Sequence, residues 1–200
     1  MGQYEATGET PGIWATHLMV DLETLSTAPD AAILSIGAVA MDSQFNQIAK
    51  FYTPINLADA IKIGMRIDAS TIMWWMGQSE EARERLCKDQ HGILQPSTTV
   101  AYALARFNQF IVGNMEDDYQ IWANGPEYDV VVLTSALLKC NMALPWKFYN
   151  VRSYRELRYL YPDVAKPEST GTQHNALDDA KWQAAHLKLI MEERGRTGGA

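Results

Sequence analysis

The order of its apolar segments predicts that this chain folds as an α/β domain, with a mixed β-sheet flanked by α-helices. Three apolar runs with strand-like patterns come first, at 16–22, 32–41 and 47–52. Stretches with helical spacing then follow, and a short apolar run at 120–123 lies among them. Strands followed by helices and further strands are typical of a mixed sheet with helices packed on its faces.

The strand-like runs define the first part of the predicted sheet. The second and third runs are joined by Asp42-Ser43-Gln44, which suits a tight turn, so these two runs are expected to pair. The two ends of the chain are mostly polar or rich in glycine. We therefore expect a flexible leader at 1–13, one domain at 14–193 and a flexible tail at 194–200.

Each of the first four predicted helices has a residue at its start that commonly caps or begins helices. Asp68, Ser79 and Ser97 are expected to cap three helices, because their side-chain oxygens can accept hydrogen bonds from free backbone N–H groups. Pro126 suits the start of a fourth helix, where its missing N–H is not needed. The predicted helices are 69–76, those that start at 79, 97 and 126, and those at 154–160 and 175–193.

Charge and cysteine content argue against several classes of protein. The 200 residues include 17 Lys and Arg against 24 Asp and Glu, a net charge of −7, which argues against binding nucleic acid or membrane through bulk positive charge. Cys87 and Cys140 lie far apart, so we expect neither a disulfide scaffold nor a zinc ribbon, and we expect a reducing, cytoplasmic location. The apolar-rich run at 31–41 is too short to cross a bilayer, which needs about 20 residues, so no membrane partner is expected.

Two carboxylates lie at the end of the first predicted strand, in Asp21-Leu22-Glu23. Residues i and i+2 of a strand project to the same face, so Asp21 and Glu23 are expected to point together while Leu22 packs on the opposite face. Two carboxylates held so close repel each other unless a cation lies between them, and hard oxygen ligands suit Mg²⁺ or Mn²⁺. The alternative is a solvated strand end.

Two further segments carry groups of the same chemistry. Asp129 follows the short strand at 120–123 and lies in the first turn of the next predicted helix, where it could also simply compensate the helix dipole. His174 and Asp179 are separated by four residues at the start of the last helix. Asp178 is the competing acid, but its side chain points about 100° away around the helix.

In this order and spacing, the three segments resemble the histidine-containing branch (DEDDh) of the DEDD superfamily of 3′→5′ exonucleases, from about Thr16 to Ile190. The stretches MVDLETLSTAPDAAILSIGAVAMD and IDASTIMWWMGQSEEAR are similar to a group of phage and bacterial 3′→5′ exonucleases and exoribonucleases. The resemblance implies a ribonuclease H-like fold and a metal-dependent phosphodiester hydrolase. The residues that it implies as ligands of two divalent metal ions, Mg²⁺ or Mn²⁺, are Asp21, Glu23, Asp129 and Asp179.

The resemblance also implies His174 as the general base of a two-metal-ion mechanism, since its ordinary pKa allows it to take a proton from water at neutral pH. The implied activity releases nucleoside 5′-monophosphates from the 3′ ends of single-stranded DNA or RNA. Two alternatives remain: an oligoribonuclease-like enzyme for short RNA, and a nucleic-acid-binding module that turns over weakly. Many enzymes of this kind are dimers, so the resemblance also allows a homodimer.

Residues next to the first acidic pair are candidates for substrate contacts. In the family, this strand end cradles the terminal nucleotide, which implies roles for Leu22, Thr24 and Leu25, although ordinary packing explains Leu25 equally well. On the helix at 69–76, Trp75 shares a face with apolar residues, whereas Trp74 projects about 100° away and could stack on a base.

A local basic stripe follows residue 150. Arg152, Arg155 and Arg158 could bind backbone phosphates, with Arg152 as the expected contact, whereas a solvated helix face explains at least Arg158 better.

Overall fold

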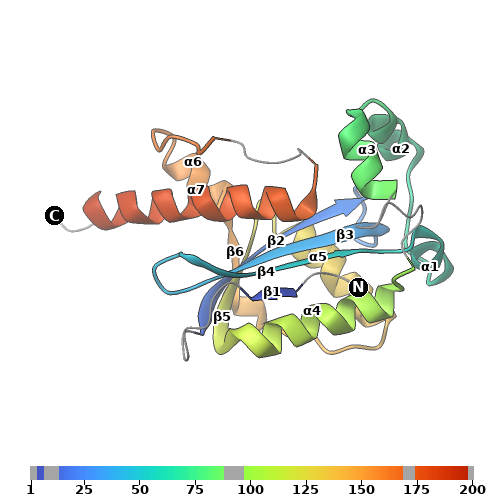
Figure 1. Cartoon of the computed structure of the whole chain (residues 1–200), viewed down its shortest axis with the longest axis horizontal. Helices are drawn as coiled ribbons and strands as arrows, with labels where there is room; N and C mark the ends of the chain where they lie inside the picture. Colours follow the sequence, from blue (N-terminus) through green and yellow to red (C-terminus); the bar gives the residue numbers. More distant parts are fainter. Residues whose placement is uncertain (1–3, 7–13, 88–96, 169–173, 198–200) are drawn as a thin grey trace.

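The computed structural model describes residues 4–6, 14–87, 97–168 and 174–197, and these residues form a mixed six-stranded sheet between two layers of helices (Figure 1). The strand order is β1-β4-β3-β2-β5-β6, in which the first four strands pair antiparallel and β5 and β6 run parallel to β2. The strands are β1 (Tyr4–Ala6), β2 (Ala15–Thr24), β3 (Ile33–Met41), β4 (Gln47–Pro54), β5 (Met115–Ala123) and β6 (Val151–Ser153). The predicted mixed sheet flanked by helices is confirmed.

Helices cover both faces of the sheet (Figure 1). On one face lie α4 (Val100–Asn114) and α5 (Asp129–Lys139). On the other face lie α6 (Tyr154–Leu160) and the long α7 (Ala176–Thr197). Near the end of β2 the chain forms the short helices α1 (Leu57–Lys62), α2 (Ala69–Met76) and α3 (Glu80–Cys87), and a 3₁₀ turn at Phe148–Asn150 precedes β6.

Successive side chains of β2 point to opposite faces of the sheet, so they pack against different helices. Leu18, Val20 and Leu22 belong to the core under α4 and α5, whereas Met19 packs in the core under α7. Because side chains alternate along a strand, Asp21 and Glu23 continue the face of Met19 and point toward α7. The predicted opposition of the two acids to Leu22 is therefore confirmed.

A glycine allows α7 to approach the sheet at this point. Gly37 of β3 lies directly opposite Asp21 of β2. A Cβ atom on Gly37 would lie 2.1 Å from the carbonyl carbon of Ala176 and 2.3 Å from the backbone nitrogen of Leu177. Any side chain at position 37 would thus push the first turn of α7 away from β2.

Two predicted helix starts are wrong, because both helices begin two or three residues later in the chain. Helix α4 is capped by Thr99, whose hydroxyl accepts a hydrogen bond from the backbone of Tyr102 at 3.2 Å, and not by Ser97. Helix α5 begins at Asp129 rather than at Pro126, because residues 126–128 form a turn.

The other two predicted caps behave differently from each other. Ser79 is confirmed as a cap, since its hydroxyl accepts a hydrogen bond from the backbone N–H of Ala82 at 3.2 Å. Asp68 stands at the N-cap position of α2 but makes no capping bond. Its carboxylate instead accepts a hydrogen bond from the hydroxyl of Ser26 at 2.5 Å, which ties α2 to the end of β2.

Parts of the predicted leader (1–13) and tail (194–200) have regular secondary structure. Within the segment 1–13, Tyr4–Ala6 pair with β4 as an edge strand, and the rest of that segment lies outside the described residues. Helix α7 continues to Thr197, past the predicted domain end at 193. Among the described residues, no helix combines the length and the apolar character needed to cross a membrane.

Candidate active site

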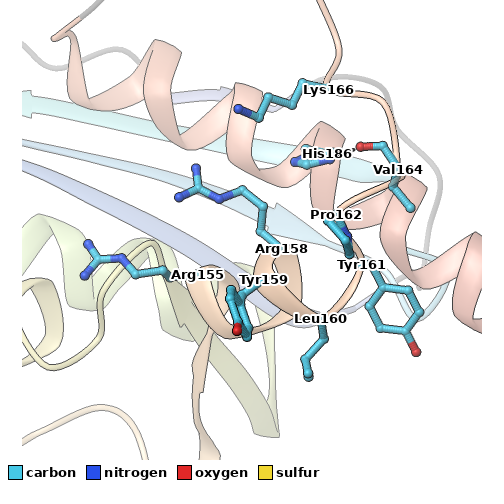
Figure 2. A pocket seen from close by; sticks show the side chains of 9 residues that line it. All are labelled: Arg155, Arg158, Tyr159, Leu160, Tyr161, Pro162, Val164, Lys166 and His186. Carbon is cyan, nitrogen blue, oxygen red and sulfur yellow. Dashed lines mark hydrogen bonds between the residues drawn. The ribbon is translucent and has the colours of Figure 1, made fainter.

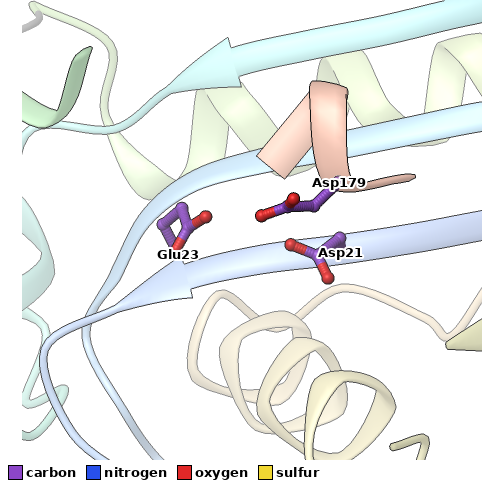
Figure 3. Close-up of side chains that lie close together, drawn as sticks. All are labelled: Asp21, Glu23 and Asp179. Atoms are coloured by element: carbon purple, nitrogen blue, oxygen red, sulfur yellow. The ribbon is translucent and has the colours of Figure 1, made fainter. Parts of the chain in front are cut away.

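Three carboxylates meet above the end of β2. One oxygen from each of Asp21, Glu23 and Asp179 lies within 4.8 Å of the other two. Figure 3 shows Asp21 and Glu23 rising from β2 toward Asp179, which descends from the start of α7. We call these three residues the acidic cluster.

The first turn of α7 is held in a defined geometry, which fixes Asp179. Asn175 precedes the helix and is buried, and its side-chain oxygen accepts a hydrogen bond from the backbone N–H of Asp178 at 3.1 Å. The carbonyl of Asn175 accepts a hydrogen bond from the N–H of Asp179 at 2.9 Å. One oxygen of Asp179 accepts a hydrogen bond from the backbone N–H of His174 at 3.1 Å. As predicted, Asp178 points elsewhere, to Lys181 at 3.0 Å.

Asp129 approaches the cluster from the opposite layer of the molecule. It is the first residue of α5 and is buried, with 7% of its surface exposed. Its carboxylate lies outside the group of three oxygens that meet within 4.8 Å. Its negative charge nevertheless raises the pKa of both Asp21 and Glu23. The structure therefore brings all four predicted acids to one end of the sheet.

Burial and mutual repulsion make this group of acids resist ionisation. Burial raises the pKa of Asp21 well above its ordinary value, and the charges of Asp129, Glu23 and Asp179 raise it further. The pKa of Glu23 rises to about 8, first through burial and then through the charges of Asp179 and Asp129. Burial likewise raises the pKa of Asp129 to about 7, although backbone hydrogen bonds and the charge of Arg155 oppose it. A divalent cation with a preference for oxygen ligands fits this site, because it would neutralise the repulsion.

A glutamine that the sequence analysis missed holds one of the acids in place. The side-chain amide of Gln183 donates a hydrogen bond to Asp21 at 2.7 Å. Gln183 lies one turn beyond Asp179 on α7 and is 5% exposed. Its own side-chain oxygen has no hydrogen-bond partner among the described residues. The only signal in the sequence is the spacing of four residues from Asp179, which places both side chains on one helix face.

His174 lies next to the cluster, against two tryptophans. Its backbone adopts a left-handed conformation with φ of 62°. Its ring packs edge-on against Trp74, with centroids 4.9 Å apart, and against Trp75 at 5.8 Å. The charge of His174 lowers the pKa of Asp179, which opposes the effect of burial on that acid. His174 and Asp179 thus form one unit at the start of α7.

A cavity of about 420 Å³ opens beside Glu23. Trp75 forms one wall and is anchored by its indole N–H, which donates to the carbonyl of Thr24 at 2.9 Å. Trp74 is 47% exposed and Trp75 6%, so their predicted difference in exposure is confirmed. Hydroxyl groups are the common feature of the remaining wall, and we call this space the hydroxyl-lined cavity. Its lining residues are Leu22, Glu23, Thr24, Ser26, Thr27, Ser70, Thr71, Trp74, Trp75 and Tyr128.

Of the predicted substrate contacts, Leu22, Thr24 and Trp74 line this cavity, whereas Leu25 and Arg152 do not. Leu25 is packed in the core of the domain. Arg152 lines another cavity, and its guanidinium donates to the carbonyl of Tyr149 at 2.7 Å. The structure places Arg155, rather than Arg152, where its charge acts on Asp129.

Residues 16–191 match the family described as the 3′-5′ exoribonuclease Rv2179c-like domain. An exodeoxyribonuclease of Enterobacteria phage T4 is 23% identical over 159 residues, which cover 68% of each chain. These matches confirm the predicted resemblance to phage and bacterial 3′→5′ exonucleases.

Solved structures of exonuclease I share the fold. An apo form has a TM-score of 0.64 at 16% identity and covers 92% of this chain and 43% of its own. The zinc-bound complex of Escherichia coli exonuclease I with single-stranded DNA has a TM-score of 0.64 at 17% identity, with 92% of this chain and 42% of that chain covered. The enzyme from Methylocaldum szegediense has a TM-score of 0.62 at 11% identity, with 90% and 41% covered. The chain thus spans less than half the length of these solved structures. Their TM-scores confirm the predicted ribonuclease H-like fold.

Proposed function

Because this chain belongs to the 3′-5′ exoribonuclease Rv2179c-like domain family, we propose that it hydrolyses single-stranded nucleic acid from its 3′ end and releases nucleoside 5′-monophosphates. The observation that carries this proposal is the acidic cluster, in which oxygens of three carboxylates lie within 4.8 Å of one another beside a cavity of about 420 Å³. A cavity next to a group of carboxylates is where a terminal nucleotide and its phosphate can lie together.

The four acids are proposed to hold two divalent ions, Mg²⁺ or Mn²⁺. Asp21, Glu23 and Asp179 would hold the ions through oxygens that lie within 4.8 Å of one another, and Asp129 would supply a fourth carboxylate next to them. Bound ions of this kind stabilise the attacking and leaving oxygens of a phosphoryl transfer. The raised pKa values of the acids support the assignment, since a bound cation removes the repulsion that causes part of the rise.

His174 is the proposed general base. It takes one proton from the attacking water, whose oxygen forms a bond to the 3′-terminal phosphorus. The bond from that phosphorus to the 3′-oxygen of the preceding nucleotide breaks, and this oxygen takes up a proton from solvent. A histidine suits this step because its ordinary pKa lies close to neutral pH. The hydrogen bond from the backbone of His174 to Asp179 ties the base to the cluster.

The hydroxyl-lined cavity is proposed to hold the terminal nucleoside. Trp74 is half exposed at its rim and offers a ring for base stacking, which is worth about 1–3 kcal/mol per base in other single-strand binders. Leu22 and Thr24 line it and are proposed to contact the nucleoside, whereas Leu25 packs in the core. Arg152 lines a separate cavity, so any phosphate that it binds is proposed to lie there and not in the hydroxyl-lined cavity.

The sugar of the substrate is proposed to be either ribose or deoxyribose. The family description refers to an exoribonuclease, while the phage T4 relative is named an exodeoxyribonuclease. The exonuclease I structures include complexes with single-stranded DNA. A homodimer and a cytoplasmic location remain predictions from the sequence.

Stepwise shortening of 5′-labelled single strands of RNA and DNA tests the function. We expect a ladder of products with Mg²⁺ or Mn²⁺ and none with EDTA. Asp179→Asn should abolish the ladder, whereas its neighbour Asp178→Asn, whose carboxylate points to Lys181, should retain it. Binding without shortening by the unchanged protein would contradict the proposal and favour a binding module, and activity confined to the shortest RNAs would favour an oligoribonuclease-like enzyme.

A further inference from the structure

A second cavity, of about 790 Å³, lies outside the proposed catalytic site and carries three positive charges. Arg155 and Arg158 come from α6, and Lys166 comes from the segment that follows it. In Figure 2 the nitrogen ends of these three side chains point to the same side. We call this the basic cavity; its lining residues are Arg155, Arg158, Tyr159, Leu160, Tyr161, Pro162, Val164, Lys166 and His186.

Two of the three charges are not neutralised by neighbouring acids. Arg155 pairs with Glu127 at 3.2 Å, and more than half of each side chain is exposed. No carboxylate in the part of the chain that the structure describes forms an ion pair with Arg158 or Lys166. Arg158 instead lies over the ring of Tyr154, 5.7 Å from its centre. In a chain with a net charge of −7, this is a local positive surface that can attract an anion.

The basic cavity lies on the same side of α7 as the acidic cluster. Asp179 belongs to the cluster, Gln183 contacts Asp21, and His186 lines the basic cavity. These residues follow one another at spacings of four and three, so they share one face of the helix. Seven residues of helix correspond to about 10 Å along its axis.

The near end of the basic cavity touches the turn that leads to Asp129. A Cβ atom on Gly125 would lie 3.0 Å from the guanidinium of Arg155. The carbonyl of Gly125 in turn accepts the backbone N–H of Asp129, at 3.1 Å. The positive groups therefore begin beside the fourth acid and extend away from the proposed site of cleavage.

We propose that Arg155, Arg158 and Lys166 bind the backbone phosphates of the substrate strand, upstream of the bond that is cleaved. This inference rests on the proposed function and extends it to the part of the strand outside the catalytic site. The distance of about 10 Å along α7 from Asp179 to His186 corresponds to about three nucleotides of a stacked strand, whose bases are spaced by about 3.4 Å. Guanidinium groups suit the partner, because they donate two parallel hydrogen bonds to one phosphate.

An exposed aromatic ring adds a second type of contact. Tyr159 lines the basic cavity and is 81% exposed. A base that follows a bound phosphate can stack on such a ring. Cations and an exposed ring on one surface fit a single strand better than they fit a duplex, whose bases are already stacked on each other.

The test compares the double variant Arg158→Ala/Lys166→Ala with Lys62→Ala/Lys147→Ala. The control removes the same charge from exposed positions that line neither cavity. Hydrolysis is measured as kcat/KM on dinucleotides and on single strands of about eight nucleotides. We expect the first variant to match the unchanged protein on dinucleotides and to lose about tenfold or more on the longer strands.

Salt dependence identifies the contact as phosphate. The slope of log affinity against log salt concentration, measured in EDTA with the longer strands, should become shallower by about 1.4 for the loss of two phosphate contacts. A charge-retaining variant, Arg158→Lys/Lys166→Arg, should keep most of the slope, and its folding can be compared by thermal unfolding. Equal losses on all lengths, or losses equal to those of the control, would overturn the proposal.

The two proposals can fail separately. If no strand is shortened but the salt slope depends on Arg158 and Lys166, the proposed function fails while the strand-binding surface stands. If strands are shortened normally and the double variant shows no dependence on length, only the strand-binding surface fails.

Discussion

Gln183 touches the acidic cluster through a single hydrogen bond, from its amide to Asp21 at 2.7 Å. This bond fixes the orientation of a carboxylate that is proposed to bind metal. Partners of this kind commonly change metal affinity or activity by about 10–100-fold when they are removed. Gln183→Leu should therefore weaken Mn²⁺ binding by about that factor, measured by calorimetric titration.

Gln47 provides the matched control for that change. Its amide also donates to α7, to the carbonyl of Lys181 at 3.1 Å, but it does not touch the acids. Gln47→Leu should leave Mn²⁺ affinity within about twofold of the unchanged protein. Equal losses in both variants would show that Gln183 acts on the packing of α7 and not on Asp21.

His174 provides a second test at the level of a single residue. Removal of a general base costs about 10²–10⁴ in rate, so His174→Ala should slow hydrolysis by that amount. Mn²⁺ binding should change little, because the proposed ligands are carboxylates. Hydrolysis near the unchanged rate would refute this role.

The residues of the site were predictable where their chemistry has a pattern in sequence. Asp21 and Glu23 are two apart on a strand, and His174 and Asp179 are five apart at a helix start, so each pair is visible locally. Gln183 was not predicted, because a glutamine one turn along a helix resembles any other helical residue. The hydroxyl-lined cavity is formed by residues of β2, α2 and the turn before α5. These segments are far apart in the sequence, so no local sequence pattern could predict the cavity.

Elements were predictable when they were long enough to show a period. The buried strand β3 and the amphipathic helix α4 span several periods each, and both are present as expected. Strands β1 and β6 have three residues each and owe their conformation to pairing with β4 and β5. Three residues cannot display alternation, so these edge strands could not be predicted.

The contact between α7 and β3 leads to a test at the level of elements. A methyl group on Gly37 would meet the backbone of Ala176 at 2.1 Å, and backbone cannot move aside as a flexible side chain can. Gly37→Ala should therefore shift the first turn of α7 and carry Asp179 away from Asp21. We expect a loss of activity of about 100-fold, together with about 1–3 kcal/mol of stability.

Gly195 is the control for this change, since it lies in the same helix and a Cβ atom there would meet nothing within 4 Å. Gly195→Ala should retain full activity and be neutral or slightly stabilising. Activity would be measured on labelled single strands and stability by denaturant unfolding. Full activity of Gly37→Ala would contradict the assigned role of this contact.

At the scale of the whole molecule, the raised pKa values predict how stability depends on pH. Glu23 and Asp129 have pKa values of about 8 and about 7 in the folded protein, above the ordinary values of 4.5 and 3.8. A raised pKa means that the folded protein holds the proton more tightly than the unfolded chain does. The contribution of these groups to stability is therefore fully present below about pH 4 and is lost as pH rises toward 8.

Thermal unfolding in EDTA should show this loss as a fall in Tm of about 5 °C or more between pH 5.5 and pH 8. Added Mn²⁺ should reverse most of the fall at pH 8, because the cation replaces the protons. Glu23→Gln should reduce the pH dependence, whereas Asp178→Asn should leave it nearly unchanged. A Tm in EDTA that does not fall with pH would contradict the electrostatic account of the site.

The acidic cluster combines two segments that open at different rates. Asp21 and Glu23 lie on β2 inside the sheet, whereas Asp179 lies at the start of α7. β2 lies between β3 and β5, so its amides are expected to exchange with solvent only when the whole domain unfolds. Asp179 stands in the first turn of a helix, where local opening requires far less free energy. Transient fraying of that turn would withdraw one ligand while Asp21 and Glu23 stay in place. The rate at which ions leave the site should therefore follow the opening of α7, and hydrogen exchange at Asp179 would measure it.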